Sequence, residues 1–338
     1  MIANKRAALP LLGTLVLSLT APATLAQEVR VYSGRHYSSD NAIYERFTKA
    51  TGIKVRLLES NDSAIVERLR NEGRNSSADV LILVDAAKLA HATELGLFQP
   101  IGNAELMRDV PLSLRDPKGR WFGLTRRVRA FVVNPKLVNP GSLRTYADLA
   151  NPALKGKLCL RNRNSVYNQS LVADQLILRG QPATRSWIRG MIANLADPVY
   201  TSDTVLARDV ARGKCGVGVV NSYYVARMLS GQNGAADKAL AARVCIVYPN
   251  PAHVNVSGAG VTRHATNRTQ AIQLIEYLTS PTAAEGFAQG SFEYPLKGFG
   301  NNPILKRFGP FTPDGLSAAQ LGAKAKAASQ LMADNGWQ

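Results

Sequence analysis

The regular alternation of short apolar runs with longer amphipathic segments restricts the fold of this chain more than any other feature. Each of the first three apolar runs after residue 26 is typical of a strand, and each is followed by a segment with helical spacing of apolar residues. These runs predict strands at 29–33, 54–58 and 78–83, and helices at 40–51, 63–73 and 86–95. The order is typical of an α/β fold with a mainly parallel sheet and helices on both faces.

A second alternating series indicates a second lobe, and 338 residues are sufficient for two hydrophobic cores. The long run "GLTRRVRAFVVN" predicts a strand over 123–134, and a turn-rich link follows it. Beyond the link we expect strands at 158–160, 216–220 and 243–250, helices at 168–179 and 183–194, and a mostly helical tail from about 266.

The chain is expected to cross between the lobes twice, near 126–134 and near 247–256. We therefore expect an N-terminal lobe made of residues 27–127 plus 252–300. The remaining residues, 128–251 plus 301–338, would form a C-terminal lobe.

Residues 1–26 have the pattern of an export signal. Two basic residues precede an apolar run over 7–19, and small residues lead up to Ala26. The apolar run is shorter than the roughly 18 residues of a membrane-spanning helix, and no later segment reaches that length. We expect cleavage after Ala26 and an exported protein, with a retained membrane anchor as the alternative.

The formal net charge of +17 raises the question of a nucleic acid partner. The lysines and arginines are scattered, however, without a basic block or a stripe interleaved with aromatic residues. We therefore expect no nucleic acid partner. A positive surface could instead attract anionic ligands or an anionic membrane partner.

The three cysteines, Cys159, Cys215 and Cys245, lie in apolar, strand-like runs. An oxidising compartment allows one disulfide and leaves one thiol. Cys159 and Cys215 each precede a tyrosine of interest by a few residues, so they could lie on neighbouring strands and form the pair. The spacing of the three matches no zinc motif.

No catalytic motif is present in the sequence. It has no Gly-x-Ser-x-Gly elbow, no Walker A loop and no His-Glu-x-x-His motif. We therefore expect that the chain is not an enzyme. An exported iron enzyme is the weaker alternative, because no separate acid or base has a clear role.

Four tyrosines stand out because each follows a predicted strand and precedes a helical segment. Tyr37 lies in "SGRHYSSDN" beside His36, Tyr167 lies in "RNRNSVYNQS", and Tyr223 and Tyr224 lie in "VVNSYYVARML". Ligands of open α/β sheets bind at the carboxyl ends of strands. We therefore expect the four phenols to share one site, although any one of them alone could be an ordinary tyrosine at the surface.

Several phenols at one place indicate a strongly charged cation. A free phenol has a pKa of about 10, but a bound metal ion can remove its proton. Phenolate is a hard anionic donor, which suits Fe(III) better than Cu(I) or Zn(II). His36 could add one nitrogen ligand. The main alternative is an organic anion that the tyrosines contact and the arginines hold.

The sequence resembles the ferric-ion-binding proteins of bacterial iron ABC importers. The resemblance is carried by the segments around the four tyrosines and by "YSGRHYSSDNAIYERFTKATGIKV", "DVLILVDAAKLAHATELGLFQP" and "HVNVSGAGV". The resemblance covers nearly the whole chain after the signal. It implies a two-lobed periplasmic-binding-protein fold (type II), in which each lobe has a mainly parallel sheet flanked by helices and two crossing strands form a hinge. It also implies Tyr37, Tyr167, Tyr223 and Tyr224 as Fe(III) ligands, with His36 a ligand in some members only.

The resemblance further implies a possible synergistic anion such as carbonate, which some members hold with arginine. The matching positions here are Arg127 and Arg227. A guanidinium would offset the surplus negative charge of four phenolates on a trivalent ion. The alternative for Arg127 is a solvated face shared with Arg126 and Arg129 on the same predicted strand. Arg35 is a weaker candidate for the same role.

The function that the resemblance implies is capture of Fe(III) between two closing lobes in the periplasm. The protein would then deliver the ion to an inner-membrane ABC permease with its ATPase, and we expect a monomer. A binding protein of the same fold for an organic anion or an iron chelate is the alternative. The sequence leaves open whether His36 touches the metal and whether Fe(II) is also bound.

Overall fold

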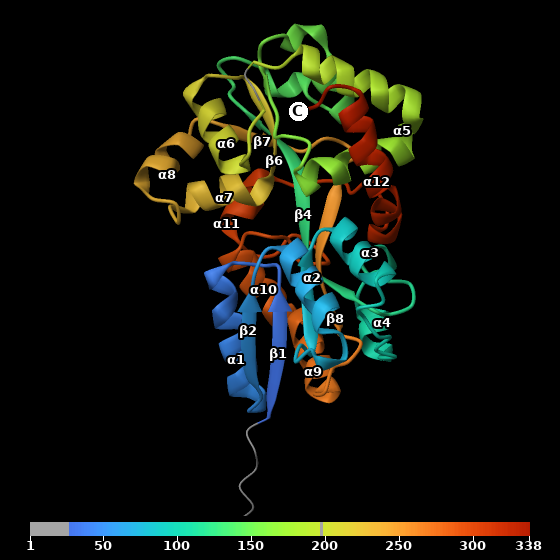
Figure 1. Ribbon diagram of the computed structural model, residues 1–338. Coiled ribbons are helices and arrows are strands. Elements are labelled where there is room, and N and C mark those ends of the chain that lie inside the picture. Colours follow the sequence, from blue (N-terminus) through green and yellow to red (C-terminus); the bar gives the residue numbers. More distant parts are fainter. Residues whose placement is uncertain (1–26, 197–198) are drawn as a thin grey trace, which may run out of the picture.

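The N-terminal part of the chain folds in the predicted order of strands and helices. The computed structural model describes residues 27–196 and 199–338, so the expected export signal lies outside the described residues. The first elements (Figure 1) are β1 (Glu28–Ser33), α1 (Asn41–Thr51), β2 (Lys54–Glu59), α2 (Asp62–Glu72), β3 (Val80–Val84), α3 (Ala86–Glu94) and the short α4 (Ala104–Asp109).

Local signals in the sequence set the ends of these helices. α1 ends at Gly52, whose φ of 76° lies in the left-handed region that glycine adopts without strain. α2 begins after Asn61, whose side chain accepts a hydrogen bond from the backbone N–H of Ala64. The apolar faces of the two helices, which include Phe47 and Ile65, belong to the same hydrophobic core as β1 and β3.

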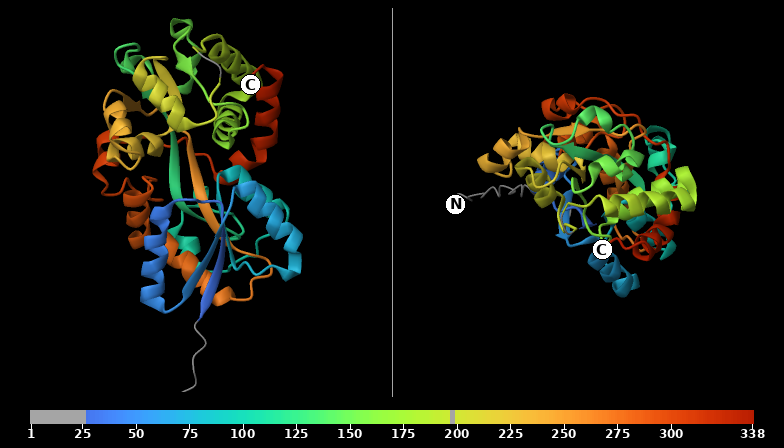
Figure 2. Two further views of the ribbon diagram at one scale, coloured as in Figure 1. Left: turned by 60° about the vertical axis from the view of Figure 1, so that its left-hand side comes forward. Right: turned by 90° about the horizontal axis from the view of Figure 1, so that it is seen from above.

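Two long strands connect the lobes, in agreement with the two crossings expected from the sequence. β4 (Phe122–Val133) and β8 (Val254–Val261) are buried along their whole length. They run antiparallel from one lobe into the other (Figures 1 and 2). The first part of β4 pairs with β8, whereas its last residues pair with β6 (Val217–Asn221) and β7 (Cys245–Val247).

The strands follow the order β2-β1-β3-β8-β4-β6-β5, where β5 is Leu158–Cys159, and β7 also pairs with β4. The pairs outside the crossing strands are parallel: β1 with β2 and β3, and β5 with β6. The pairs made by β4 and β8 are antiparallel. The parallel pairs on either side of the crossing strands match the predicted parallel sheet. The centre of the sheet is antiparallel because β4 and β8 cross between the lobes in opposite directions.

The second lobe is built on a long helix with a break. α5 (Val166–Ala193) is interrupted at Gly180, where φ is 76°, and Pro182 follows. The two helices predicted over this region therefore meet at the break. The lobe also contains α6 (Asp203–Arg212), α7 (Ser222–Ser230) and α8 (Ala235–Ala241). The expected disulfide joins Cys159 to Cys215.

The C-terminal region is mostly helical, as predicted, and it packs on both lobes. Its helices are α9 (Arg268–Thr279), α10 (Pro281–Gly290), α11 (Pro303–Phe308) and α12 (Ala318–Asp334). α12 lies against α3 of the first lobe and α5 of the second (Figure 1). Its Leu321 belongs to the core of the first lobe and its Leu331 to the core of the second. α12 therefore spans the junction, and the lobe boundaries given above stay a prediction.

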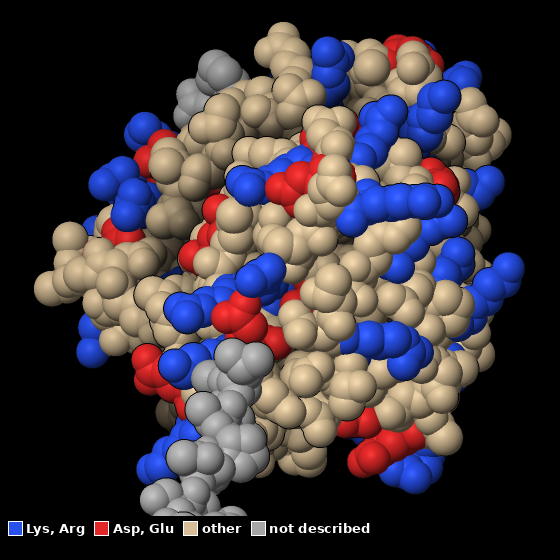
Figure 3. Space-filling view, turned by 60° about the horizontal axis from the view of Figure 1, so that its bottom comes forward, with Lys and Arg blue, Asp and Glu red and all other residues tan. Residues whose placement is uncertain are grey.

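The surface carries basic side chains without a single basic stripe on the face that Figure 3 presents. Lys and Arg are interspersed there with Asp and Glu. Within residues 27–196 and 199–338, no helix is both long enough and apolar enough to span a membrane.

Candidate functional site

The four tyrosines singled out from the sequence follow three strands. Tyr37 lies in the loop after β1, and Tyr167 lies in the first turn of α5, which follows β5. Tyr223 and Tyr224 lie in the first turn of α7, directly after β6. The strands therefore deliver all four phenols to the junction between the lobes.

The structure brings these phenols together. The ring centroids of Tyr37 and Tyr223 are 6.3 Å apart, and those of Tyr223 and Tyr224 are 4.4 Å apart. The hydroxyl of Tyr223 donates a hydrogen bond to the hydroxyl of Tyr167 at 3.4 Å. We call these four residues the tyrosine cluster. Because Tyr37 belongs to one lobe and the other three belong to the second, the cluster bridges the lobes.

His36 lies in the same loop as Tyr37, but its side chain is exposed. By contrast, Tyr223 is 1% exposed. Among the described residues, His36 makes no hydrogen bond or ion pair with another side chain. It is therefore next to the tyrosine cluster in sequence but outside its packed part in this conformation.

Arg227 lies over three rings of the tyrosine cluster. Its guanidinium carbon is 4.3 Å from the ring centroid of Tyr37, 5.0 Å from that of Tyr223 and 5.7 Å from that of Tyr224. The helical spacing in α7 places Arg227 one turn after Tyr223 and Tyr224, so it points back over them. One of its terminal nitrogens, Nη2, is buried without a hydrogen-bond partner.

Arg127 approaches the cluster from the crossing strand β4. Its guanidinium carbon is 5.3 Å from the ring centroid of Tyr167. The side chain is 1% exposed, and Nη2 donates to the carbonyl of Val256 at 3.2 Å. The Nε and Nη1 donors are buried and have no hydrogen-bond partner. Buried donors without partners are rare in proteins, so this arginine is suited to hold an anion.

The alternative interpretation of Arg127, a solvated face shared with Arg126 and Arg129, is wrong. None of the three side chains is more than 9% exposed. Arg126 donates to the carbonyl of Pro295 at 2.6 Å, and Arg129 donates to Oδ2 of Asp203 at 2.9 Å. The strand is buried on both faces because β4 runs through the junction, a position that its sequence pattern alone does not reveal.

Three of the four phenols of the cluster are held in their neutral form. Burial raises the pKa of Tyr37, Tyr167 and Tyr224 well above the usual value of a phenol, and the proximity of Tyr223 raises each of them further. Removing these protons without a compensating charge would place several anions together away from water. A strongly charged cation is the kind of ligand that can compensate for that loss.

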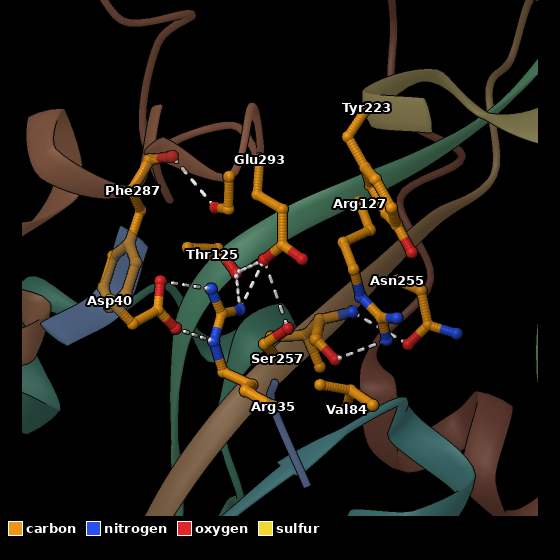
Figure 4. Close-up of polar contacts among 12 residues, drawn as sticks. Arg35, Asp40, Val84, Thr125, Arg127, Tyr223, Asn255, Ser257, Phe287 and Glu293 are labelled. Carbon is orange, nitrogen blue, oxygen red and sulfur yellow. Dashed lines mark hydrogen bonds and ion pairs between the residues drawn. The ribbon is translucent and has the colours of Figure 1, made fainter. Parts of the chain in front are cut away.

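A buried ion-pair network fixes the loop that carries Tyr37 (Figure 4). Arg35, which is 2% exposed, donates from Nε to Oδ2 of Asp40 at 2.8 Å and from Nη1 to Oε2 of Glu293 at 2.6 Å. The hydroxyl of Thr125 donates to the same oxygen of Glu293. The guanidinium carbon of Arg35 is 4.8 Å from the ring centroid of Tyr37, so the network supports that ring.

Glu293 lies between two arginines in Figure 4, Arg35 and Arg127. Burial favours its neutral form, but these two guanidinium groups outweigh burial and hold the pKa of Glu293 below its usual value. Its second oxygen, Oε1, is buried without a partner. The sequence does not single out Glu293, because it lies in a tail expected only to be helical and is separated from Arg35 by 258 residues.

The end of the chain holds the loop that precedes Tyr167. The indole N–H of Trp337 donates to the carbonyl of Arg161 at 2.8 Å, and the backbone N–H of Arg163 donates to the carbonyl of Gln338 at 2.7 Å. The guanidinium carbon of Arg161 is 5.4 Å from the ring centroid of Tyr167. The C-terminal residues therefore lie close to one side of the candidate site.

Comparison with protein families gives a match over most of the chain. Residues 75–310 match the family described as bacterial extracellular solute-binding protein. The chain belongs to this family. The two-lobed fold and the convergence of tyrosines and arginines at the junction agree with membership of a family of solute-binding proteins.

Known relatives of this solute-binding protein are named for iron uptake or iron binding. Iron uptake protein A1 of Synechocystis is 41% identical over 317 residues, which cover 92% of this chain and 88% of that protein. The Fe(3+)-binding periplasmic protein of Serratia marcescens is 29% identical over 93% of each chain. The resemblance to ferric-ion-binding proteins is thereby confirmed.

Solved structures confirm the fold. A Trichodesmium protein (IdiA, FutA) in complex with iron and citrate has a TM-score of 0.88 and 39% identity, covering 92% of this solute-binding protein and 100% of that chain. The Bordetella ferric binding protein has a TM-score of 0.86 and 35% identity, covering 92% and 99%. Because these relatives are transport solute-binding proteins, the expectation that the chain is not an enzyme is also confirmed.

Proposed function

We propose that this solute-binding protein captures Fe(III) with Tyr37, Tyr167, Tyr223 and Tyr224 and delivers it to an ABC permease. The observation that carries the proposal is the convergence of four phenols from two lobes, with hydroxyl groups of Tyr223 and Tyr167 at 3.4 Å. Phenolate oxygens are hard donors, and Fe(III) is a hard, highly charged ion. The iron in the names of the relatives supports the same cargo.

Binding of Fe(III) would replace the protons of the phenols. Because burial keeps the pKa of Tyr37, Tyr167 and Tyr224 high in the metal-free protein, each tyrosinate ligand formed releases a proton. The affinity for Fe(III) should therefore increase with pH. Arg127 and Arg227 would offset the surplus negative charge of the bound tyrosinates.

Closure of the lobes would complete the site. We propose that the lobe of residues 27–127 plus 252–300 rotates against the lobe of residues 128–251 plus 301–338 about β4 and β8. His36 lies in the loop of Tyr37 and is exposed in the described conformation, so the four phenols come together without it. Because the described conformation already packs Tyr37 against Tyr223, it would correspond to the closed form, and Fe(III) would favour it over an open form in which the lobes are apart.

The place of action would be the periplasm, after removal of residues 1–26. A relative from Serratia marcescens is named as a periplasmic protein. The family of extracellular solute-binding proteins supports an inner-membrane ABC permease as partner, and we propose that its ATPase drives import. The protein would act as a monomer.

The test is a titration of the purified metal-free protein with Fe(III), followed by absorbance and mass. One ion per chain should bind and give a visible charge-transfer band from tyrosinate to iron. The double variant Tyr223→Phe, Tyr224→Phe should lose the band. Tyr277→Phe, which changes a half-buried tyrosine of α9 outside the cluster, should keep it. An uncoloured wild-type protein in excess Fe(III) would refute the proposal.

A second candidate is capture of iron together with an anion or as a chelate. Arg127 offers two buried donors without partners, and Arg227 offers one. The Trichodesmium relative was solved with iron and citrate. A titration with Fe(III) alone, with bicarbonate and with citrate would separate these cases. If an anion is required, Arg127→Gln should weaken binding only where that anion is present; equal weakening in all three titrations favours binding of the bare ion.

A further inference from the structure

A second cluster of titratable side chains lies outside the tyrosine cluster, at the start of the crossing strand β8. Asp174 is on α5, His253 directly precedes β8, and Asp314 is in the segment before α12. Nδ1 of His253 is 3.2 Å from Oδ2 of Asp314 and 3.7 Å from Oδ1 of Asp174. We call these three residues the hinge triad. One donor atom from each lies within 4.8 Å of the other two.

The hinge triad is shielded from water. His253 and Asp174 are 0% exposed, and the side chain of Asp314 is 2% exposed. The other ring nitrogen of His253, Nε2, is 3.1 Å from the hydroxyl oxygen of Ser170. That contact occupies Nε2 and leaves Nδ1 as the atom that faces both carboxylates.

The partners of the two carboxylates leave one oxygen free. Asp314 accepts hydrogen bonds from the backbone N–H groups of Val254 and Leu316. Oδ2 of Asp174 accepts one from the side chain of Gln175 at 2.7 Å. Oδ1 of Asp174 has no hydrogen-bond partner, although it is buried. This oxygen faces Nδ1 of His253 at 3.7 Å, which is an ion-pair distance but too long for a hydrogen bond.

The hinge triad would carry a surplus negative charge if both carboxylates were ionised, because one imidazole can carry only a single positive charge. Burial raises the pKa of Asp174 and so favours its neutral form in the absence of a metal ion. A surplus negative charge in a water-free environment is costly unless it is paired. A doubly charged cation would neutralise both carboxylates and would also contact Oδ1 of Asp174, which has no hydrogen-bond partner.

We propose that the hinge triad binds a divalent first-row metal ion of the Zn²⁺ class through Asp174, His253 and Asp314. Imidazole and carboxylate are common ligands of such ions. A cation about 2.1 Å from each ligand atom requires those atoms to lie about 3 to 4 Å apart, and the two carboxylate oxygens lie 3.2 Å and 3.7 Å from Nδ1. With Nδ1 bound to the ion, Nε2–H would donate to Ser170 and fix the orientation of the ring.

The proposed ion would serve the hinge rather than the cargo. Its ligands come from α5, from the segment before β8 and from the segment before α12, so it would join three elements that meet at the junction. It also differs in chemistry from Fe(III) on phenolates, because its donors are one nitrogen and two carboxylates. Since only the folded chain assembles these donors, the ion should stabilise the folded state.

The test uses Co²⁺ as a spectroscopic probe of the metal-stripped protein. One Co²⁺ per chain should bind and give visible ligand-field bands, and Zn²⁺ should abolish them by competition. The double variant Tyr223→Phe, Tyr224→Phe should bind Co²⁺ as the wild type does, because the hinge triad is separate from the tyrosine cluster. Binding should weaken at least tenfold in Asp174→Asn, and in His253→Gln as a second variant. Asp237→Asn, which affects a buried aspartate paired with Arg208 at 2.7 Å, should bind normally.

Two results would overturn this proposal. One is the absence of Co²⁺ binding by the wild type, and the other is undiminished binding by Asp174→Asn with native near-ultraviolet circular dichroism. In either case no metal ion would bind the hinge triad, and a proton on His253 would be its only bound cation. Against the effect of burial, the neighbouring carboxylates of Asp174 and Asp314 raise the pKa of His253 to about 9. Stability would then be lost as the pH rises through this value, regardless of divalent metal.

Discussion

At the candidate site, the positions of single residues are set by buried charged side chains, which form ion pairs with one another in the absence of a ligand. Arg35 contacts Asp40 and Glu293, and Arg129 contacts Asp203. Removing one partner from such a pair is costly because the other charge stays buried. The positions of the phenols therefore depend on residues that would never touch the iron.

Glu293→Gln tests this dependence. The free energy of unfolding should fall by about 3 kcal/mol, because Arg35 loses one of its two buried carboxylate partners. Fe(III) affinity should fall as well, because Arg35 packs against Tyr37. Urea unfolding and iron titration measure the two effects. Asp109→Asn removes an exposed pair with Arg108 and should leave the stability almost unchanged; an equal loss in both variants would contradict the prediction.

Asp62 should give the stability a pH dependence of its own. Its Oδ1 accepts a hydrogen bond from the backbone N–H of Val84 at 2.9 Å, and burial raises its pKa to about 6. Because the pKa is higher in the folded state, the contribution of Asp62 is full below about pH 4 and is lost as the pH rises through its folded pKa. Asp62→Asn should therefore be more stable than the wild type at neutral pH, by about 1 kcal/mol. Urea unfolding should show no such difference below about pH 4; a difference that does not vary with pH would refute the assignment.

At the scale of elements, three strand ends deliver the tyrosines, and a covalent bond ties two of those strands together. β5 and β6 are parallel neighbours, and the disulfide links Cys159 of β5 to Cys215, just before β6. β5 leads to Tyr167, whereas β6 leads to Tyr223 and Tyr224. The disulfide therefore fixes the relative position of the two segments that carry three of the four phenols.

Removal of the disulfide by Cys159→Ala with Cys215→Ala should lower the free energy of unfolding by about 4 kcal/mol, because the unfolded chain regains the freedom of a long loop. The sequence separation of the two cysteines is 56 residues. Urea unfolding of the double variant measures the loss. Cys245→Ala, which changes the half-buried free cysteine, should cost about 1 kcal/mol or less. A disulfide variant as stable as Cys245→Ala would contradict the expectation.

The helices and strands also show which structural features can be predicted from sequence patterns and which cannot. Alternating apolar runs predict β1 to β3, the break in α5 and the phenols beyond β5 and β6, because these depend on local spacing. They do not predict that β4 exchanges partners from β8 to β6 and β7, nor that Arg35 pairs with Glu293. Such contacts join distant parts of the chain, and the chemistry of either residue alone does not specify its partner. The buried state of Arg126 and Arg129 is hidden for the same reason.

At the scale of the whole molecule, two crossing strands and α12 join the lobes. The strands continue the sheet through the junction, and α12 contributes to both cores. A rotation of the lobes must therefore bend β4 and β8 while α12 keeps or shifts its contacts. The three connections should therefore limit the size of any rotation of one lobe against the other.

Small-angle X-ray scattering can detect the proposed movement. The radius of gyration should decrease when Fe(III) is added, because ligands from both lobes are drawn to one ion. The double variant Tyr223→Phe, Tyr224→Phe should keep the radius of its metal-free form. If the wild type binds Fe(III) without any change in scattering, closure as the consequence of binding is refuted.

The contacts of Trp337 and Gln338 with the loop before Tyr167 bear on how the protein can be handled in the laboratory. An affinity tag or fluorescent fusion attached after Gln338 would start next to that loop and compete for its hydrogen bonds. Recombinant material carrying such an extension should bind iron less tightly than material tagged ahead of Gln27. The N-terminal position is therefore the better choice for purification and for immobilisation on a sensor chip.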